Sequence, residues 1–155
     1  KKLFVYLMNK IFFFVLYLTI FLIHGSLAQE KFLSLKKNKV NVRYGPTFDS
    51  PIKYIYTKKN LPVRQIDKKE NFRRIIDIKN NSGWIHSSQL KPSNSIIVLK
   101  TKVLFKRPSK FSKPIIRLEK GRLLIVKNCL DNWCNVKTEK YIGWIEKENI
   151  WGSAN

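Results

Sequence analysis

The sequence contains few of the groups on which catalysis and metal binding depend. Ten Asp and Glu, two His and two Cys occur among 155 residues, and the acidic residues are scattered along the chain. We find no Ser/His/Asp set, no glycine-rich phosphate loop and no paired carboxylates. We therefore expect no enzyme, no catalytic residue, no metal site and no cofactor.

Helical periodicity is also missing. No stretch keeps apolar residues at the 3.6-residue spacing of an amphipathic helix for twelve residues. Short runs of Val, Ile, Phe, Tyr and Leu instead alternate with Gly, Pro, Asn, Asp and Ser, which is typical of short strands joined by turns. The sequence predicts an all-β protein with strands near Phe32–Leu35, Val40–Arg43, Ile52–Tyr56, Leu61–Asp67, Phe72–Ile78, Gly83–His86, Ile96–Lys100, Val103–Phe105, Ile115–Leu118, Arg122–Asn128, Trp133–Lys137 and Tyr141–Ile145.

Long apolar runs are absent except for one, Ile11–Ile23. Lys10 precedes this run, and Ser26-Leu27-Ala28 follows it with small residues at the two positions that a signal peptidase reads. We expect residues 1–28 to be a cleaved signal peptide. The alternative is an uncleaved membrane anchor, but a span needs about twenty apolar residues. Met8 opens a Met-Asn-Lys start, so the status of residues 1–7 stays open.

The expected mature chain begins at Gln29 and has no second apolar segment that could enter a membrane. We therefore predict a periplasmic or secreted protein without a transmembrane segment in its mature part. N-terminal sequencing of the exported protein would test the cleavage site.

Basic charge greatly exceeds acidic charge. The formal net charge is +21, and the three lysines of the expected signal peptide account for three of these charges, which leaves +18. This balance favours an anionic envelope polymer or lipid surface as partner. The basic residues are also mostly Lys, without a dense cluster, in a chain rich in Asn, Ile and Phe, as an AT-rich genome encodes. Both origins of the charge stay open, and a secreted destination argues against nucleic acid.

The chain repeats itself at a period of about sixty residues. Gly83-Trp84-Ile85 returns as Gly143-Trp144-Ile145, and Asn71–Ile75 corresponds to Asn132–Val136. A period of this length suits a small barrel better than a solenoid repeat. We predict two barrels, at residues 29–91 and 92–155, joined by a linker at Lys91–Asn94.

Two cysteines flank the predicted tip of a hairpin in the second unit. Residues that face each other across antiparallel strands lie about 4.5 to 5.5 Å apart between Cα atoms, close to what a disulfide needs. In an oxidising compartment we expect Cys129 and Cys134 to be bonded. Free thiols and a redox or metal site are the alternatives, although the spacing is not Cys-x-x-Cys and the nearest candidate ligand, His86, lies in the other unit.

The first unit resembles the bacterial SH3-like (SH3b) domain. That family opens with an Asn-x-Arg-x-Gly-Pro segment and ends with Gly-Trp, a hydrophobic residue and a short turn. The corresponding segments occur here in the same order, at Asn41–Pro46, Pro51-Ile52, Leu61–Val63, Phe72–Ile75 and Gly83–Leu90.

The second unit resembles a degenerate copy of the same domain. It has Val103–Pro108 in place of the Asn-x-Arg segment, but it keeps Trp133 and the Gly143-Trp144-Ile145 end. The whole arrangement is similar to secreted tandem-SH3 proteins of alphaproteobacterial type. The resemblance implies two SH3-like barrels in tandem and an envelope binding role, without a defined ligand.

We expect ligand binding on the first barrel, near the Tyr44–Ser50 loop. The candidate ligand-binding residues are Arg43, Tyr44, Tyr54 and Trp84. Arg43 could contact a carboxylate or a glycan, or it could brace the loop through backbone hydrogen bonds. Trp84 could line a ligand groove or belong to the core. The loop has a single acidic residue, so we do not expect polyproline binding.

The combined pattern predicts a non-enzymatic envelope module that recognises peptidoglycan through its stem-peptide carboxylates. A protein–protein interaction or scaffolding module acting on an envelope partner is the alternative. Regulation of an envelope enzyme in trans is a third hypothesis.

Overall fold

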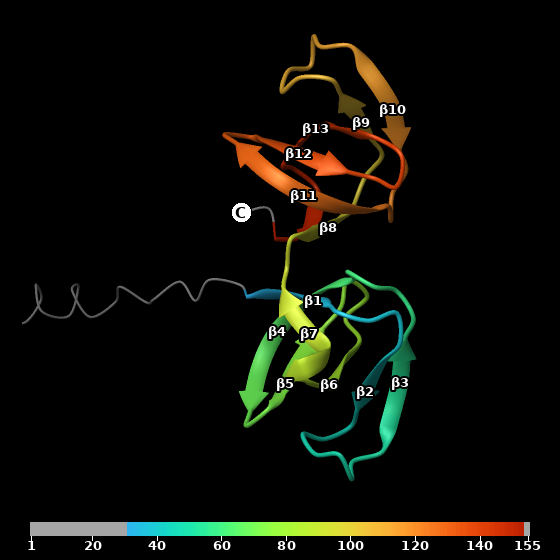
Figure 1. Ribbon diagram of the computed structural model, residues 1–155, viewed down its shortest axis with the longest axis vertical. Coiled ribbons are helices and arrows are strands. Elements are labelled where there is room, and N and C mark those ends of the chain that lie inside the picture. Colours follow the sequence, from blue (N-terminus) through green and yellow to red (C-terminus); the bar gives the residue numbers. More distant parts are fainter. Residues whose placement is uncertain (1–30, 154–155) are drawn as a thin grey trace, which may run out of the picture.

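The computed structural model describes residues 31–153 as two small barrels stacked along one axis (Figure 1). The expected signal peptide, residues 1–28, lies outside the described residues. Within them, no helix is long and apolar enough to cross a membrane. The all-β prediction is confirmed, since the described residues form fourteen strands and a single turn of 3-10 helix.

The first barrel is a seven-stranded antiparallel sheet that curls on itself. Its strand order is β3-β2-β6-β5-β4-β1-β7, so the first strand lies beside the last. Its elements are β1 (Phe32–Leu35), β2 (Val40–Arg43), β3 (Ile52–Tyr56), β4 (Pro62–Lys69), β5 (Phe72–Ile76), β6 (Ser82–His86), η1 (Ser87–Gln89) and β7 (Leu90–Pro92).

The second barrel repeats this topology strand for strand. Its order, β10-β9-β13-β12-β11-β8-β14, matches that of the first sheet when seven is added to each strand number. The internal repeat of the sequence is therefore a structural repeat. Its elements are β8 (Ser95–Val98), β9 (Lys102–Phe105), β10 (Pro114–Leu118), β11 (Leu123–Leu130), β12 (Trp133–Lys137), β13 (Ile142–Glu146) and β14 (Ile150–Gly152).

Each barrel encloses its own apolar core. Alternate residues of every strand point inward, because side chains on a strand alternate between the two faces of the sheet. In β2, for example, Val40 and Val42 are fully buried while Asn41 and Arg43 are half-buried on the other face. The first core contains Leu33, Leu35, Val40, Val42, Val63, Ile75, Ile85 and Leu90, and the second Ile96, Val98, Leu104, Leu118, Leu124, Val126, Cys134, Val136 and Ile145.

The shared Gly-Trp-Ile segment has a steric cause. In both barrels its glycine lies where the strand passes very close to a neighbouring strand. A Cβ atom on Gly83 would lie 3.0 Å from the carbonyl oxygen of Arg43, and one on Gly143 would lie 2.6 Å from that of Phe105. The following Ile is fully buried, and the Trp between them faces outward. The motif therefore serves barrel closure first.

The predicted disulfide is present at the tip of the β11–β12 hairpin. Cys129 and Cys134 are directly paired in the antiparallel register, with Cα atoms 4.0 Å apart. Closing so short a loop stabilises the folded state by only about 2 kcal/mol in the chain-entropy account. That is still a large share of what a barrel of this size can supply alone.

The two barrels meet through strands that are buried on both faces. All four residues of β8 are buried, because Ile96 and Val98 face the second core while Ile97 faces the first barrel. The hydroxyl groups of Ser34 and Ser95, both fully buried, lie 2.7 Å apart across the junction. The Ser95 hydroxyl also donates to the carbonyl oxygen of Asn60 at 2.7 Å.

Aromatic packing extends the same junction. The ring of Trp151, in β14, meets the ring of Phe32 edge-on with centroids 5.2 Å apart. The guanidinium of Arg64, in β4, lies 5.6 Å from the centroid of the Trp151 ring. The connection between the barrels is short, because Lys91 and Pro92, expected in the linker, belong to β7. Ser93 and Asn94 alone join the two sheets.

Candidate binding surfaces

The structure brings two of the predicted site residues together on the outer face of the first barrel. Arg43 and Trp84 are direct neighbours in the register of β2 and β6, and Trp84 also pairs with Arg74 of β5. Each of the three has a buried core residue beside it in its strand, namely Val42, Ile75 and Ile85, so their side chains lie on the outer face of the sheet. Arg43, Trp84 and Arg74 thus form one basic row with an aromatic centre.

The Tyr44–Ser50 loop folds over the end of this row. Nη1 of Arg43 donates to the carbonyl oxygen of Ser50 at 2.7 Å, which fixes the loop at its far end. The loop also lays Phe48 against Phe72 and His86, with ring centroids 5.2 and 4.9 Å away. The observed contacts of Arg43 are those of a brace, which favours the second of the two roles considered for it.

Tyr44 is the most accessible of the predicted site residues, with 65% of its surface exposed. Its backbone N–H donates to the carbonyl oxygen of Pro51 at 3.1 Å, which closes the base of the loop. The ammonium of Lys53 lies 5.5 Å from the centroid of its ring. Tyr44 is therefore largely accessible, with Lys53 beside its ring.

Tyr54 lies on the opposite face of the sheet, because it pairs with the core residue Val42 in the register of β2 and β3. It belongs to a polar cluster at the mouth of the first barrel. The hydroxyl groups of Tyr54 and Tyr56 lie 3.4 Å apart, and the Tyr56 hydroxyl donates to Oδ2 of Asp77 at 3.0 Å. The predicted set is thus divided between two surfaces.

Asp77 anchors this cluster with both carboxylate oxygens. Oδ1 accepts the backbone N–H groups of Lys79 and Asn81 at 2.8 and 2.9 Å, and Oδ2 also accepts from the Asn81 side chain at 3.0 Å. Asp77 is 6% exposed, so its carboxylate interacts with groups of the turn rather than with solvent. Burial raises the pKa of Tyr54 and of Tyr56 above the ordinary value near 10, at which a tyrosine is already neutral at physiological pH.

A hollow runs from this mouth across the barrel junction. One cavity of about 520 Å³ is lined by the Tyr54–Tyr56 strand, Leu61, Asp77 and Ile78. A second of about 520 Å³ shares Leu61 and Ile78 with it and continues over Ile97 to Gly121 in the second barrel. We name this pair of cavities the junction groove.

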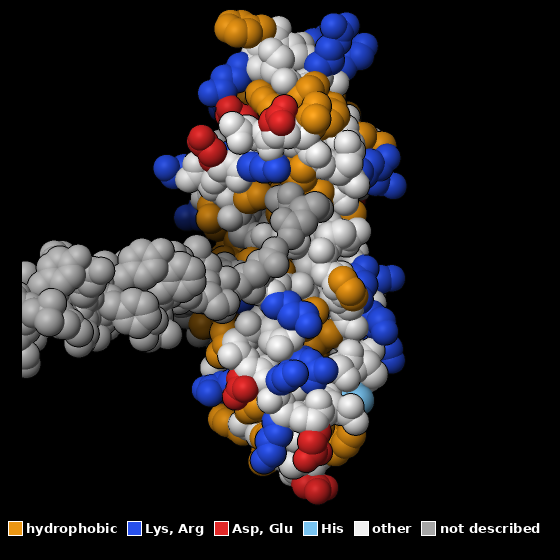
Figure 2. Space-filling model, turned by 90° about the vertical axis from the view of Figure 1, so that its left-hand side faces the viewer, with side chains coloured by type: hydrophobic (Ala, Val, Ile, Leu, Met, Phe, Trp, Pro, Cys, Tyr) orange, Lys and Arg blue, Asp and Glu red, His pale blue; other side chains and the backbone are white. Residues whose placement is uncertain are grey.

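The junction groove has an apolar floor and a basic rim. Leu61, Ile78 and Ile97 form much of the floor, and the exposed side chains of Lys58, Lys79 and Lys120 stand around it. Asp77 is the acidic residue that lines it, and its carboxylate is already fully hydrogen-bonded. Lys and Arg side chains are spread widely over both barrels, with few acids among them (Figure 2).

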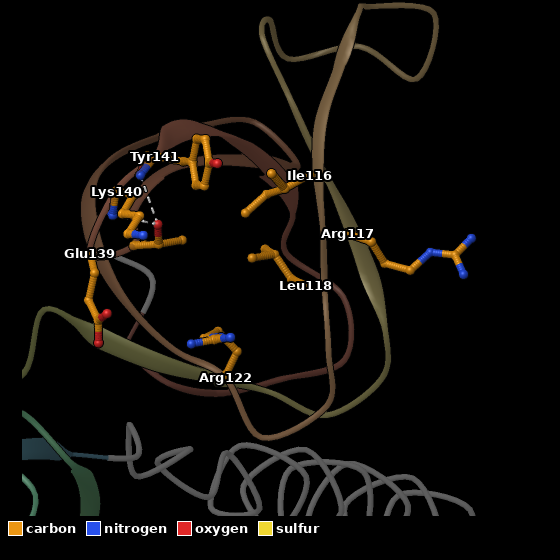
Figure 3. Close-up of a pocket in the computed structure, with 8 residues that line it drawn as sticks. Ile116, Arg117, Leu118, Arg122, Glu139, Lys140 and Tyr141 are labelled. Atoms are coloured by element: carbon orange, nitrogen blue, oxygen red, sulfur yellow. Dashed lines mark hydrogen bonds between the residues drawn. The ribbon is translucent and has the colours of Figure 1, made fainter.

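The second barrel carries an equivalent mouth with different residues at its tyrosine and aspartate positions. Ile116 and Leu118 occupy the places of the two tyrosines, and they line a cavity of about 250 Å³ with Arg122 and Tyr141 (Figure 3). Thr138 replaces Asp77 there, and its hydroxyl accepts the backbone N–H groups of Lys140 and Tyr141. The turn is kept, but the buried carboxylate and its tyrosine partner are lost.

Apart from Tyr54, the residues of the junction groove were not predicted as a site. Lys58, Lys79 and Lys120 come from three separate turns and look like solvated surface charges in the sequence. The Tyr54/Tyr56 alternation in β3 is the one signal that pointed towards the groove. No group of three metal-ligating side chains occurs among residues 31–153.

The two-barrel topology and these hollows are those of a tandem small-barrel binding protein. The hollows are open grooves rather than a single enclosed pocket. A family model of the bacterial SH3 domain matches residues 36–92 and again residues 99–152, which is well over half of the chain. The chain therefore belongs to the bacterial SH3 domain family, as the first-unit motif indicated. Domains of this family are binding modules, often related to the cell wall.

Two solved structures with a partial likeness are NlpC2 and NlpC1 from Trichomonas vaginalis. NlpC2 is 15% identical with a TM-score of 0.38, over 83% of this chain and 50% of that chain. NlpC1 is 13% identical with a TM-score of 0.37, over 83% and 48%. This chain spans about half of their length. No role is inferred from a likeness this low. A comparison with curated proteins gives no match.

Proposed function

We propose that this chain is an exported, non-enzymatic binding module of the bacterial cell envelope that recognises peptidoglycan. The junction groove carries the proposal. It combines an apolar floor, two neutral tyrosine hydroxyl groups and a rim of three lysines within one continuous hollow. A stem peptide offers both carboxylates and short apolar side chains to such a surface.

The chemistry of the groove separates two contributions to binding. Lys58, Lys79 and Lys120 are exposed, so each attracts a carboxylate through water and is screened by salt. Leu61, Ile78 and Ile97 are half-buried or buried, and contact with them persists at high salt. Binding to peptidoglycan is therefore expected to weaken with ionic strength without vanishing.

A sacculus pull-down with a charge-matched control tests the proposal. The triple variant Lys58→Gln, Lys79→Gln, Lys120→Gln removes the rim, and we expect the bound fraction to correspond to at least a roughly tenfold weaker affinity. The variant Lys37→Gln, Lys69→Gln, Lys127→Gln removes the same charge from exposed positions outside the groove. Equal binding by the two variants would refute recognition at the groove.

A protein partner is the second candidate, and one observation favours it. β3 lies at the end of the first sheet, so one of its edges is unpaired, and Ile52 and Ile55 on it are 46% and 42% exposed. An extended segment of a partner can add to such an edge. Three results together would favour this candidate. The protein captures an envelope protein at high salt, the variant Ile55→Pro abolishes this capture, and sacculus binding is absent.

A further inference from the structure

Phe111 is the most exposed large hydrophobic residue of the described chain. Its side chain is 101% exposed, whereas the next in this group, Tyr44 and Phe48, are 65% and 64% exposed. It lies in the segment 106–113 between β9 and β10, which we name the apical loop. The ring is therefore free to contact something outside the barrel, and burial of its apolar surface there would be favourable.

The apical loop is held in shape by its own hydrogen bonds. The backbone N–H of Arg107 donates to the Ser112 hydroxyl at 2.9 Å, and that of Phe111 donates to the Ser109 hydroxyl at 3.2 Å. The N–H of Lys106 donates to the carbonyl oxygen of Lys113 at 3.0 Å, which closes its base. The loop therefore presents Phe111 on a structured turn.

The apical loop contains four cationic residues, which precede and follow Phe111 in the sequence, namely Lys106, Arg107, Lys110 and Lys113. All four are exposed, and no acidic residue lies within the loop. Lys110 alone is paired, with its ammonium 3.0 Å from the Glu146 carboxylate of β13. The other three cations have no salt bridge within the described residues, so the loop offers a strongly positive tip.

The corresponding loop of the first barrel is built differently. There, Phe48 lies against the rings of Phe72 and His86, and the loop carries Asp49 beside it. In the second barrel the equivalent strand position to Phe72 is Trp133, and its ring contacts Phe105 instead, with centroids 5.8 Å apart. The aromatic residue of the apical loop is thus not used in barrel packing.

The apical loop also occupies a distinctive place in the molecule. It lies at the free end of the second barrel, at the far pole from the first barrel (Figure 1). A hollow of about 390 Å³ is lined by Lys110 of the loop with Phe105, Glu146 and Glu148, but Phe111 is not part of its lining. The protruding ring is suited instead to a soft surface that it can enter.

We propose that the apical loop docks this protein on an anionic lipid surface. Phe111 enters the boundary between headgroups and acyl chains, while Lys106, Arg107 and Lys113 contact lipid phosphates. Docking through this pole leaves the first barrel and the junction groove directed away from the membrane. This inference is independent of the ligand proposed for the groove.

Vesicle co-sedimentation tests the proposal. The protein used is residues 29–155, which retains both described barrels and omits the apolar run Ile11–Ile23. We expect binding to vesicles with 30% phosphatidylglycerol and little binding to pure phosphatidylcholine. Each cation near such a surface adds roughly fivefold in affinity. We therefore expect Lys106→Gln, Arg107→Gln, Lys113→Gln to weaken binding by more than tenfold.

The aromatic ring is tested separately from charge. Phe111→Ser should weaken vesicle binding roughly tenfold, and Phe111→Leu should retain most of it, since both Phe and Leu can enter the acyl boundary. The matched control is Leu130→Ser, another exposed apolar residue at a hairpin tip of the same barrel, 54% exposed. It should bind like the unaltered protein. Thermal unfolding of each variant should be unchanged.

The proposal would be overturned by equal binding to anionic and zwitterionic vesicles, by equal loss for Phe111→Ser and Leu130→Ser, or by an effect of Phe111→Ser on isolated sacculi but not on vesicles. The last would assign the apical loop to the polymer rather than to lipid. If the protein fails to bind vesicles while the groove variants still lose sacculus binding, membrane docking is refuted and the proposal for the groove stands.

Discussion

Arg43 illustrates how one side chain serves the family motif at the residue scale. Its Nη1 holds the carbonyl oxygen of Ser50, and its guanidinium lies 5.9 Å from the centroid of the Phe48 ring. In the second barrel Phe105 occupies the same position, and it makes an aromatic contact with Trp133 in place of the hydrogen bond. That contact joins β9 to β12, and the 106–113 loop is held by its own hydrogen bonds instead.

This geometry leads to a prediction for Arg43→Ala. A charged hydrogen bond is worth about 1.5 to 3 kcal/mol, and partial exposure places this one near the lower end. We expect a loss of about 1 to 1.5 kcal/mol in the free energy of unfolding of the first barrel, measured by urea denaturation.

The control for that experiment is Arg74→Ala, which removes the same charge from an exposed position in the same basic row. It should leave stability within about 0.5 kcal/mol of the original. If instead Arg43→Ala keeps full stability while ligand affinity falls tenfold, Arg43 acts in binding rather than as a brace.

The sequence analysis grouped Arg43, Trp84 and Tyr54 as one site, but the structure keeps only Arg43 and Trp84 together and places Tyr54 on the other face of the sheet. Arg43 and Trp84 belong to the family motif, and each lies next to a buried residue in its strand. A register shift between Val42 and Arg43 changes the pairing with β3. Such a local irregularity depends on three-dimensional packing, and no residue type in the sequence marks it.

At the scale of elements, β3 carries the polar mouth of the first barrel. Tyr54 and Tyr56 project from the same face, and their rings meet edge-on with centroids 5.2 Å apart. Burial raises the pKa of Tyr56 far above its ordinary value near 10, and its hydrogen bond with Tyr54 acts in the same direction. The folded chain therefore keeps these phenolic protons after the unfolded chain has lost them.

Stability should consequently fall in alkaline solution. The contribution of the tyrosine pair is complete below about pH 10, where both states are neutral, and decreases above it because the unfolded state ionises first. Urea denaturation between pH 8 and 11 should show that the free energy of unfolding falls as the pH rises. The slope of this fall should be shallower for Tyr56→Phe than for the original protein, by up to about 1.4 kcal/mol per pH unit. Parallel curves for the two proteins would contradict this account.

The short strands β7 and β14 show which elements the sequence could not reveal. Leu90 was assigned to the short turn that ends the first unit and Lys91–Pro92 to the linker, and no strand was predicted over Ile150–Gly152. Each has three residues, and each pairs with a strand about sixty residues earlier. Local apolar alternation needs a longer run to be visible, so these non-local pairings leave no pattern. The longer strands, by contrast, were predicted within a few residues.

At the scale of the whole molecule, the two barrels share apolar and polar contacts rather than a mere tether. Ile97 is 5% exposed against the first barrel, and Ser34 and Ser95 are fully buried between the barrels. The junction groove exists because of this packing, since its rim draws on turns of both barrels. For that reason its residues could not be assembled from the sequence.

Trp151→Ala should weaken this coupling. The ring is half-buried at the junction, so we expect a loss of about 2 kcal/mol, less than the 3 to 5 kcal/mol of a fully buried Trp. In calorimetry the original protein should unfold in one transition and the variant in two separated ones.

Trp144→Ala provides the comparison, because Trp144 is also half-buried but lies on β13, whose neighbours β12 and β9 are both in the second barrel. It should destabilise the second barrel without lowering the midpoint of the first. The same separation of transitions in both variants would argue against a specific role of Trp151.

The contact between Phe32 and Trp151 joins the first strand of the described chain to the last. Chains fold from the N-terminus as they emerge, and the first sheet is complete once Leu33 can pair with Pro92. The second sheet awaits Gly152, which pairs with Ile96. The second sheet therefore closes last, and without β14 the ring of Phe32 would lose its contact with Trp151 and β8 would lose one of its pairing partners. We expect a chain truncated before Ile150 to be cleaved by proteases faster than the full chain.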